Sequence, residues 1–395
     1  MKNIKFDQVI DRHDTHCIKW DHLNQNFNFE GEDGLALWVA DMDFPCSEAI
    51  IEAMSQRLTH PIFGYGDEDD SEYDDALIQW FKRRFDWQIK AANIFFSPGV
   101  VPALAFLIQA ISQVGDGIII QSPVYYPFAK KIINNNRIVV DNPLINTNGV
   151  YTMDFIDLEN KMKQPKVKGM ILCSPHNPVG RVWHESELKE VVRIASKYHK
   201  WIISDEIHGD LIRKGNHHVP LAKCCPEYQD QIITCTAPSK SFNLAGLQNS
   251  NIIIFNKEVQ AAWKKIVIEQ ASLSSCNSFA RVATIAAYNK SEDWLNQCNA
   301  YLDENYLYLK QYLEKECPKA IVSPCEGTYL AWIDFSNYVK NQEELETLMV
   351  KKAHLVFDEG ILFGEAGSCF ERINFACPRA ILKQALERIC VVLSN

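Results

Sequence analysis

Several side chains in this chain could carry chemistry, and the most notable is Lys240. It follows a short apolar run and stands between two serines. A lysine amine condenses with an aldehyde when its surroundings lower its pKa. Asp205 and His208 follow another apolar run. Taken singly, such residues are usually structural, as a surface charge, a helix cap or a turn former. Their position after successive apolar runs favours a functional interpretation.

The apolar runs themselves predict the elements that position these side chains. They lie at residues 117–121, 169–173, 201–205, 232–235 and 251–255, with helical stretches between several of them. Buried strands that alternate with helices predict a mainly parallel sheet covered on both faces. In such a sheet, ligands bind beyond the carboxyl ends of the strands. Tyr125, Asn177, Asp205 and Lys240 each follow a run, so we expect them at one edge of the sheet.

The segment NIFFSPGVVPALAFLIQAI, which starts at Asn93, predicts a strand, a tight turn and an apolar helix. Gly99 lies in the turn, and Val100 and Val101 open the helix. Backbone N–H groups and the positive end of a helix suit a phosphate group. Many strand–helix turns of this kind bind nothing, so the signal depends on its neighbours.

Pyridoxal 5′-phosphate (PLP) catalysis requires this combination of groups. A lysine holds the cofactor as a Schiff base, and a carboxylate keeps the pyridine nitrogen protonated so that the ring accepts electrons. An aromatic ring supports the cofactor, and a helix start holds its phosphate. We therefore expect a PLP enzyme with Lys240 and Asp205 at its centre.

Composition narrows the class of protein. The chain has 395 residues and a net charge of −10, which argues against a nucleic-acid partner. No apolar run is long enough to span a membrane, and we expect a cytoplasmic protein. The 13 cysteines form no Cys-x-x-Cys pair, so we expect reduced thiols and neither a disulfide scaffold nor a bound metal.

Six motifs together resemble a known family. They are LWVADMDF, FGYG, SPGVVPAL, SPHNPVGRVW, SDEIHGDL and SKSFNLAGLQ. Their order is similar to that of the fold-type I PLP enzymes, the aspartate aminotransferase superfamily. Within it, the chain resembles the MalY/PatB-type cystathionine β-lyases, from the N-terminal arm to RINFACPR near the end. HNPVGR and SDEIH occur in many aminotransferases, whereas DMDF and FNLAGLQ are more specific.

The resemblance implies an α/β architecture with two domains. A large PLP-binding domain over residues 45–287 would hold a mostly parallel sheet of about seven strands flanked by helices. A smaller α+β domain over residues 288–395 would be joined by an arm over residues 1–44. Helices are predicted at 47–58, 71–85 and around 294–316, and strands at TYLAWIDF and RINFA.

The resemblance also implies roles for individual residues. Lys240 would hold the cofactor and act as base, and Asp205 would pair with the pyridine nitrogen. Tyr65 would reach the phosphate in the neighbouring subunit of a homodimer. The further cofactor contacts would be Asn177, Tyr125, His208, Ser239, Gly99, Val100 and Val101, and the substrate contacts Arg372, Asn177, Tyr65 and Trp38.

The resemblance implies β-elimination on L-cystathionine or a related L-cysteine S-conjugate. Many aminotransferases of the superfamily have an arginine eight residues after the lysine, where this chain has Gln248. That difference favours the lyase, but one position does not decide the reaction. A class I/II aminotransferase uses the same residues and remains an alternative. A PLP-binding regulatory protein that acts through a protein partner is a second one.

Overall fold

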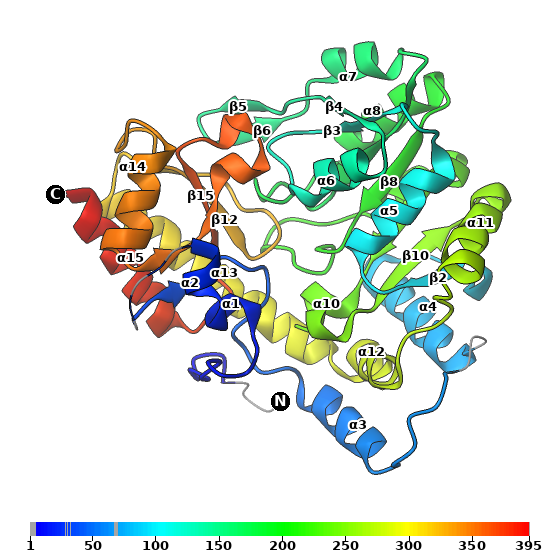
Figure 1. Cartoon of the computed structure of the whole chain (residues 1–395), viewed down its shortest axis with the longest axis horizontal. Helices are drawn as coiled ribbons and strands as arrows, with labels where there is room; N and C mark the ends of the chain where they lie inside the picture. The colour runs from blue at the N-terminus through cyan, green and yellow to red at the C-terminus, as the bar shows by residue number, and fades with distance from the viewer. Residues whose placement is uncertain (1–4, 28, 30, 32, 67–69, 395) are drawn as a thin grey trace.

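A sheet of seven strands forms the centre of the molecule (Figure 1). The computed structural model describes residues 5–27, 29, 31, 33–66 and 70–394. The strands lie in the order β2-β10-β9-β8-β7-β3-β4. Only β10 runs against its neighbours, so the prediction of a mostly parallel sheet is confirmed. The bounds are β2 Ile94–Ser97, β3 Gly117–Ile120, β4 Ile138–Asp141, β7 Val167–Cys173, β8 Trp201–Asp205, β9 Ile232–Thr236 and β10 Ser250–Ile254.

Both faces of this sheet are buried, which explains why its strands are continuous apolar runs. Successive residues point to opposite faces. Ile203 of β8 packs in a core with α5 and α11, whereas the preceding Ile202 packs in a second core with α7 and α8. The helices that cover the sheet include α5 Val100–Ile111, α6 Pro127–Asn134, α7 Phe155–Met162, α8 Glu185–Lys197 and α11 Lys257–Trp263.

A second sheet lies to the left of the first in Figure 1, in the order β11-β12-β15-β14. It packs with two long helices, α13 and α15, that belong to the same core. The bounds are β11 Ile321–Val322, β12 Leu330–Asp334, β14 Asp358–Glu359, β15 Phe370–Asn374, α13 Glu292–Glu316 and α15 Arg379–Ser394. The strand predicted at RINFA is β15, and the helix predicted near residue 294 is α13.

The N-terminal arm runs beside this second sheet (Figure 1). Its strand β1 Leu35–Ala36 pairs in parallel with β13 Leu355–Val356. The arm also contains the short helices α1 Ile18–Asp21 and α2 Leu23–Phe27. The sequence predicts only an extended arm, because helices of one turn are too short to show periodicity.

The remaining elements connect these layers. Helices are found at the positions predicted near 47–58 and 71–85, as α3 Glu48–Leu58 and α4 Ser71–Phe85. No helix of the described residues is long and apolar enough to cross a membrane. The other α-helices are α9 Leu221–Cys224, α10 Pro238–Ser241, α12 Ser278–Lys290 and α14 Gln342–Glu346, and the other strands form the hairpin β5 Ile145–Thr147 and β6 Val150–Thr152.

One cysteine pair departs from the prediction of reduced thiols. Cys317, at the end of α13, forms a disulfide with Cys390 of α15. The two residues are 73 positions apart, so no sequence spacing indicates the pair. The other 11 cysteines are free.

Candidate active site

The carboxyl ends of β2, β3, β7, β8 and β9 meet at one edge of the large sheet, because these strands run in the same direction. A cavity of about 170 Å³ lies there. Nine of the predicted cofactor contacts line it, and they come from five separate strand ends. They are Gly99, Val100, Val101, Tyr125, Asn177, Asp205, His208, Ser239 and Lys240.

Lys240 reaches the cavity from α10, the short helix after β9. Its Nζ donates a hydrogen bond to the backbone carbonyl of Ala40 at 2.6 Å. Burial lowers the pKa of Lys240 to about 8; the carboxylates of Asp41 and Asp205 oppose this shift, and Arg372 adds to it. A lysine amine with such a pKa is partly neutral near physiological pH and can act as nucleophile or base.

Asp205 is the last residue of β8 and lies between two cysteines of the neighbouring strands, Cys173 and Cys235. Its carboxylate accepts a hydrogen bond from the backbone N–H of Ile207 at 3.2 Å. Burial raises the pKa of Asp205 to about 7. Among the described residues, no cationic side chain forms an ion pair with it. A buried carboxylate in this position needs a cationic partner to stay ionised.

The turn after β2 also lines the cavity. Gly99 has a φ of +134°, a conformation that side chains with a Cβ rarely adopt. Helix α5 begins at Val100 and has no acidic residue in its first turn. The first N–H groups of a helix have no acceptor within it, so this end can bind an anion. Ser239 and Gln248 line the same cavity.

Tyr125, Asn177 and His208 complete the wall. The backbone N–H of Tyr125 donates to the carbonyl of Asn177 at 3.0 Å, which ties two strand ends together. His208 is buried, and burial lowers its pKa well below the usual value. Its Nδ1 has no hydrogen-bond partner among the described residues.

Arg372 projects from β15 of the second sheet and is buried. It donates hydrogen bonds to Oδ1 of Asn177 at 3.1 Å and to the carbonyl of Trp38 at 2.9 Å. It also forms an ion pair with Asp358, its cross-strand neighbour. The guanidinium stacks over the ring of Phe363 at 5.0 Å. Arg372 is therefore held next to the cavity by three partners and an aromatic face.

Trp38 contacts the site through its backbone carbonyl. Its indole Nε1 instead donates to the carbonyl of Lys19 at 2.9 Å, and its ring packs against Phe27. The role of Trp38 as a substrate contact stays a prediction, and its indole contacts are made within the arm.

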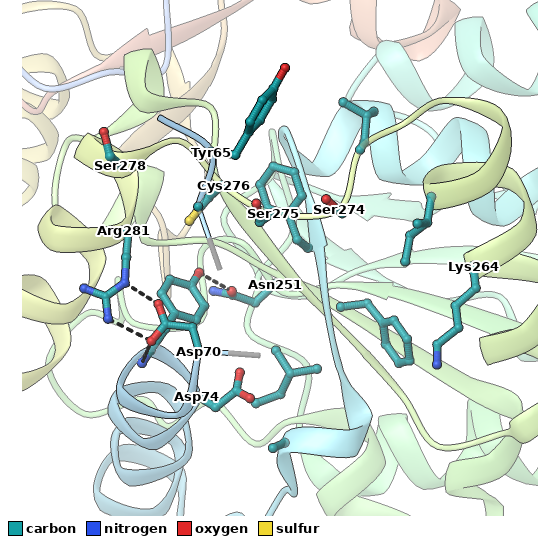
Figure 2. A pocket seen from close by; sticks show the side chains of 18 of the residues that line it. Tyr65, Asp70, Asp74, Asn251, Lys264, Ser274, Ser275, Cys276, Ser278 and Arg281 are labelled. Carbon is teal, nitrogen blue, oxygen red and sulfur yellow. Dashed lines mark hydrogen bonds and ion pairs between the residues drawn. The ribbon is translucent and has the colours of Figure 1, made fainter. Parts of the chain in front are cut away.

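Tyr65 lies outside the cavity of Lys240. Its side chain is fully exposed, and it lines a second cavity of about 800 Å³ (Figure 2). An ion pair between Asp70 and Arg281 forms part of that wall, and Figure 2 shows it beside the hydrogen bond from Tyr73 to Asn251. The two cavities share no described residue.

The cavity of Lys240 fits PLP in several respects. Asp205 offers a buried carboxylate without a cationic partner among the described residues, where a protonated pyridine nitrogen would supply one. The start of α5 offers a site for the phosphate, and Lys240 lines the same cavity. His208 brings a buried ring nitrogen that is unpaired within the described part of the chain.

Two contacts at the site carry no signal in the sequence. The first is the carbonyl of Ala40, which accepts from Lys240. Every residue has a carbonyl, so residue type does not reveal this contact. The second is Asp358, which pairs with Arg372 only because β14 and β15 are neighbours.

Most of the chain matches the model of one protein family. Residues 32–389 match the model of aminotransferase class I and II. That range includes every residue that lines the cavity.

Individual relatives match over nearly their whole length. The chain is 39% identical to cystathionine beta-lyase PatB of Bacillus subtilis over 391 residues, which is 99% of this chain and 100% of PatB. It is 32% identical to protein MalY of Escherichia coli, over 96% of each chain. A crystal structure of the PLP-bound C-S lyase from Staphylococcus hominis is 37% identical, with a TM-score of 0.94 over 100% of this chain and 99% of that one.

Proposed function

We propose, because the chain belongs to the class I and II aminotransferase family and within it to the MalY/PatB-type branch, that this protein is a PLP-dependent carbon–sulfur lyase. It catalyses β-elimination of L-cystathionine or a related L-cysteine S-conjugate. The products from cystathionine are homocysteine, pyruvate and ammonia. The observation that carries the proposal is a half-buried lysine and a buried carboxylate that line one cavity, in a chain 39% identical to a cystathionine β-lyase.

Pyridoxal 5′-phosphate is the cofactor, and when bound it supplies an aldehyde for covalent attachment and a ring that accepts electrons from the substrate Cα. Lys240 would hold it covalently, and Asp205 would keep the pyridine nitrogen protonated. Tyr125 would support the ring face. The polar contacts would come from Asn177, His208, Ser239, Gly99, Val100 and Val101, which all line the cavity.

Arg372 would bind the substrate carboxylate, with Asn177 beside it. A guanidinium binds a carboxylate through two parallel hydrogen bonds, which fixes the orientation of the amino acid as well as its position. The contacts of Arg372 to Asn177 and to the carbonyl of Trp38 support this role, because they hold its plane next to the cavity. A fixed carboxylate directs the Cα–H bond of the substrate towards Lys240.

Lys240 would move the proton of the reaction. Once the substrate amine has replaced it, its neutral amine takes the Cα proton and becomes an ammonium group. The C–S bond then breaks, and the electron pair leaves with sulfur as a thiolate, which takes up a proton. The released aminoacrylate hydrolyses to pyruvate and ammonia. A pKa of about 8 for Lys240 suits a group that accepts and returns a proton near neutral pH.

The proposed assembly is a cytoplasmic homodimer in which Tyr65 reaches the partner's cofactor phosphate. Two observations support this. Tyr65 is fully exposed, and it does not line the cavity that contains Lys240 in its own chain. The neighbouring Ile62 and Phe63 are exposed as well, which suits a surface that a second copy covers.

We also propose that residues 45–287 form the cofactor domain, and that residues 1–44 join residues 288–395 in a smaller domain. The parallel pairing of β1 with β13 supports this division.

Incubation with L-cystathionine and no keto acid tests the function. We expect a thiol and pyruvate in equal amounts, and no product from Lys240→Ala. If wild-type protein forms product only when a keto acid is supplied, the protein is an aminotransferase and the proposal is wrong.

A further inference from the structure

The segment of residues 38–43, which we call the strap, crosses the active site and contacts it through its backbone. The carbonyl of Trp38 accepts a hydrogen bond from Arg372 at 2.9 Å. The carbonyl of Ala40 accepts one from Lys240 Nζ at 2.6 Å. The strap therefore contacts the residue proposed to bind the substrate and the one proposed to move its proton.

Asn374 holds the strap on both sides of Ala40. Its Nδ2 donates to the carbonyls of Val39 at 2.7 Å and of Asp41 at 2.6 Å. Asn374 is buried, and it ends β15 two residues after Arg372. Because both flanking carbonyls are fixed by one amide, the peptide that carries the Ala40 carbonyl has little freedom to turn.

Asn243 holds the end of the strap. Its Oδ1 accepts from the N–H of Met42 at 3.0 Å, and its Nδ2 donates to the carbonyls of Met42 at 2.9 Å and Phe44 at 3.1 Å. Asn243 lies three residues after Lys240 in the sequence. Asn374 thus links the strap to the strand that carries Arg372, and Asn243 links it to the turn just after the helix that carries Lys240.

A second donor shares the Ala40 carbonyl. The hydroxyl of Tyr329 donates to it at 2.8 Å, and the side chain of Tyr329 is buried. A carbonyl oxygen has two lone pairs, so it accepts from Tyr329 and Lys240 at once. Tyr329 therefore leaves one acceptor position, which the lysine amine occupies.

We propose that the Ala40 carbonyl, set in place by Asn374, holds the amine of Lys240 whenever that amine is not bonded to the cofactor. The inference rests on the proposed function, in which substrate binding releases Lys240. The released amine would dock on this carbonyl, take the Cα proton there and stay in position as an ammonium group. Asn374 is thus a positioning residue.

The hydrogen bond to a carbonyl favours the charged form of a lysine. It therefore opposes the effect of burial, which lowers the pKa of Lys240 to about 8. Asn374 fixes the backbone of Asp41, but the carboxylate of Asp41 is held separately by Arg12. Other charged or polar groups also act on this amine from the elements around it. They are Asp41 of the strap, Asp205 of β8, His208 after it, Arg372 of β15 and the hydroxyl of Tyr329.

Acetylation of Lys240 as a function of pH, in protein stripped of PLP, tests the proposal without any turnover. The label is acetic anhydride, and peptide mass spectrometry measures its incorporation at Lys240. In Asn374→Ala the Ala40 carbonyl loses its fixed direction, so we expect the labelling midpoint to fall by about one pH unit and kcat to fall about tenfold. An unchanged midpoint would overturn the proposal.

Asn305→Ala is the matched control. The Nδ2 of Asn305 also bridges two backbone carbonyls two residues apart, those of Phe375 and Cys377, both at 2.9 Å, and the residue is buried. It does not line the cavity. We expect a comparable loss of stability with an unchanged midpoint. An equal fall of the midpoint in both variants would mean that general loosening causes it, and would also overturn the proposal.

Tyr329→Phe decides the matter if Asn374→Ala does not fold. Removing the second donor leaves the Ala40 carbonyl to Lys240 alone, which strengthens the remaining hydrogen bond, so the labelling midpoint should rise. A midpoint equal to that of the wild type would contradict the docking of Lys240 at this carbonyl. Failure of the lyase reaction in wild-type protein would be a separate result, because the labelling uses no substrate.

Discussion

Asp205 and Lys240 face the same cavity, and burial shifts the pKa of each towards neutrality, to about 7 and about 8 respectively. Burial disfavours the charged form of both groups, so it raises the pKa of the acid and lowers that of the base. Such opposed shifts at one site are typical of catalytic groups. Ionising either group in the cofactor-free site therefore costs free energy, and bound PLP would reduce that cost.

Replacing Asp205 should reveal that cost. Its pKa rises from 3.8 to about 7 on folding, so the folded state binds more protons between these pH values. Stability contributed by this group is lost as pH rises from about 4 to about 7. In protein stripped of PLP, Asp205→Asn should therefore be more stable than wild type at pH 8, by at most about 4 kcal/mol, and nearly equal at pH 4.

Urea unfolding at the two pH values measures this difference. In PLP-loaded protein the sign should reverse, because the variant cannot pair with a protonated pyridine nitrogen. A cofactor-free wild type that is as stable as the variant at pH 8 would contradict the burial of an unpaired carboxylate.

Arg372→Lys tests the carboxylate contact. Lysine keeps the charge but cannot form two parallel hydrogen bonds. We expect KM for cystathionine to rise about tenfold to a hundredfold with a smaller change in kcat. Arg213→Lys is the control, since Arg213 is also buried and bonded, to Asn299, but unlike Arg372 it has no hydrogen bond to a residue that lines the cavity. Steady-state kinetics measure these effects. An equal rise of KM in both variants would contradict a contact between Arg372 and the substrate.

At the scale of elements, a cluster of charges holds distant parts of the arm together. Asp43 accepts from Lys19 at 2.8 Å and Arg12 at 2.6 Å, and also from the indole of Trp20. Lys19 is buried, so losing its partner would leave a buried charge without full compensation.

Asp43→Asn should therefore lower the free energy of unfolding by about 3 kcal/mol, measured by urea denaturation at pH 7. Asp11→Asn is the control, because Asp11 pairs with His13 at the surface, and such pairs contribute little. A stability loss that is no larger for Asp43→Asn than for Asp11→Asn would show that the cluster does not hold the arm together.

The length and pattern of an element determine whether the sequence predicts it. The convergence of Tyr125, Asn177, Asp205 and Lys240 could be predicted, because apolar runs mark parallel strands and parallel strands end at one edge. The short helices of the arm could not, because one turn of helix leaves no periodic pattern.

Contacts between distant elements were equally hidden. The ion pair of Arg372 with Asp358 depends on the pairing of β14 with β15, and the disulfide between Cys317 and Cys390 depends on the packing of α13 near α15. The Ala40 carbonyl contacts Lys240 across 200 residues of sequence. None of these pairings follows from local residue patterns.

At the scale of the whole molecule, each site of the proposed dimer combines Lys240 of one subunit with Tyr65 of the other. Lys240→Ala and Tyr65→Ala, each alone, should lower activity strongly. Co-expression should restore it, because a mixed dimer contains one site with both residues intact. With random pairing about a quarter of the sites are intact, and activity should return to about that fraction of wild type.

Mixing each variant with excess wild-type protein provides the control for subunit exchange. Co-expressed variants that stay as inactive as either alone, although mixed dimers are isolated by two affinity tags, would contradict a shared site.

In the proposed reaction, Lys240 serves a β-elimination that needs no second substrate. The most direct test follows thiol, pyruvate and amino-acid products from L-cystathionine while the concentration of an added keto acid is raised from zero. We predict one thiol per pyruvate at every concentration, an initial rate that does not depend on the keto acid, and no activity in Lys240→Ala. A rate that starts at zero and rises with the keto acid, together with a new amino acid, would contradict the account.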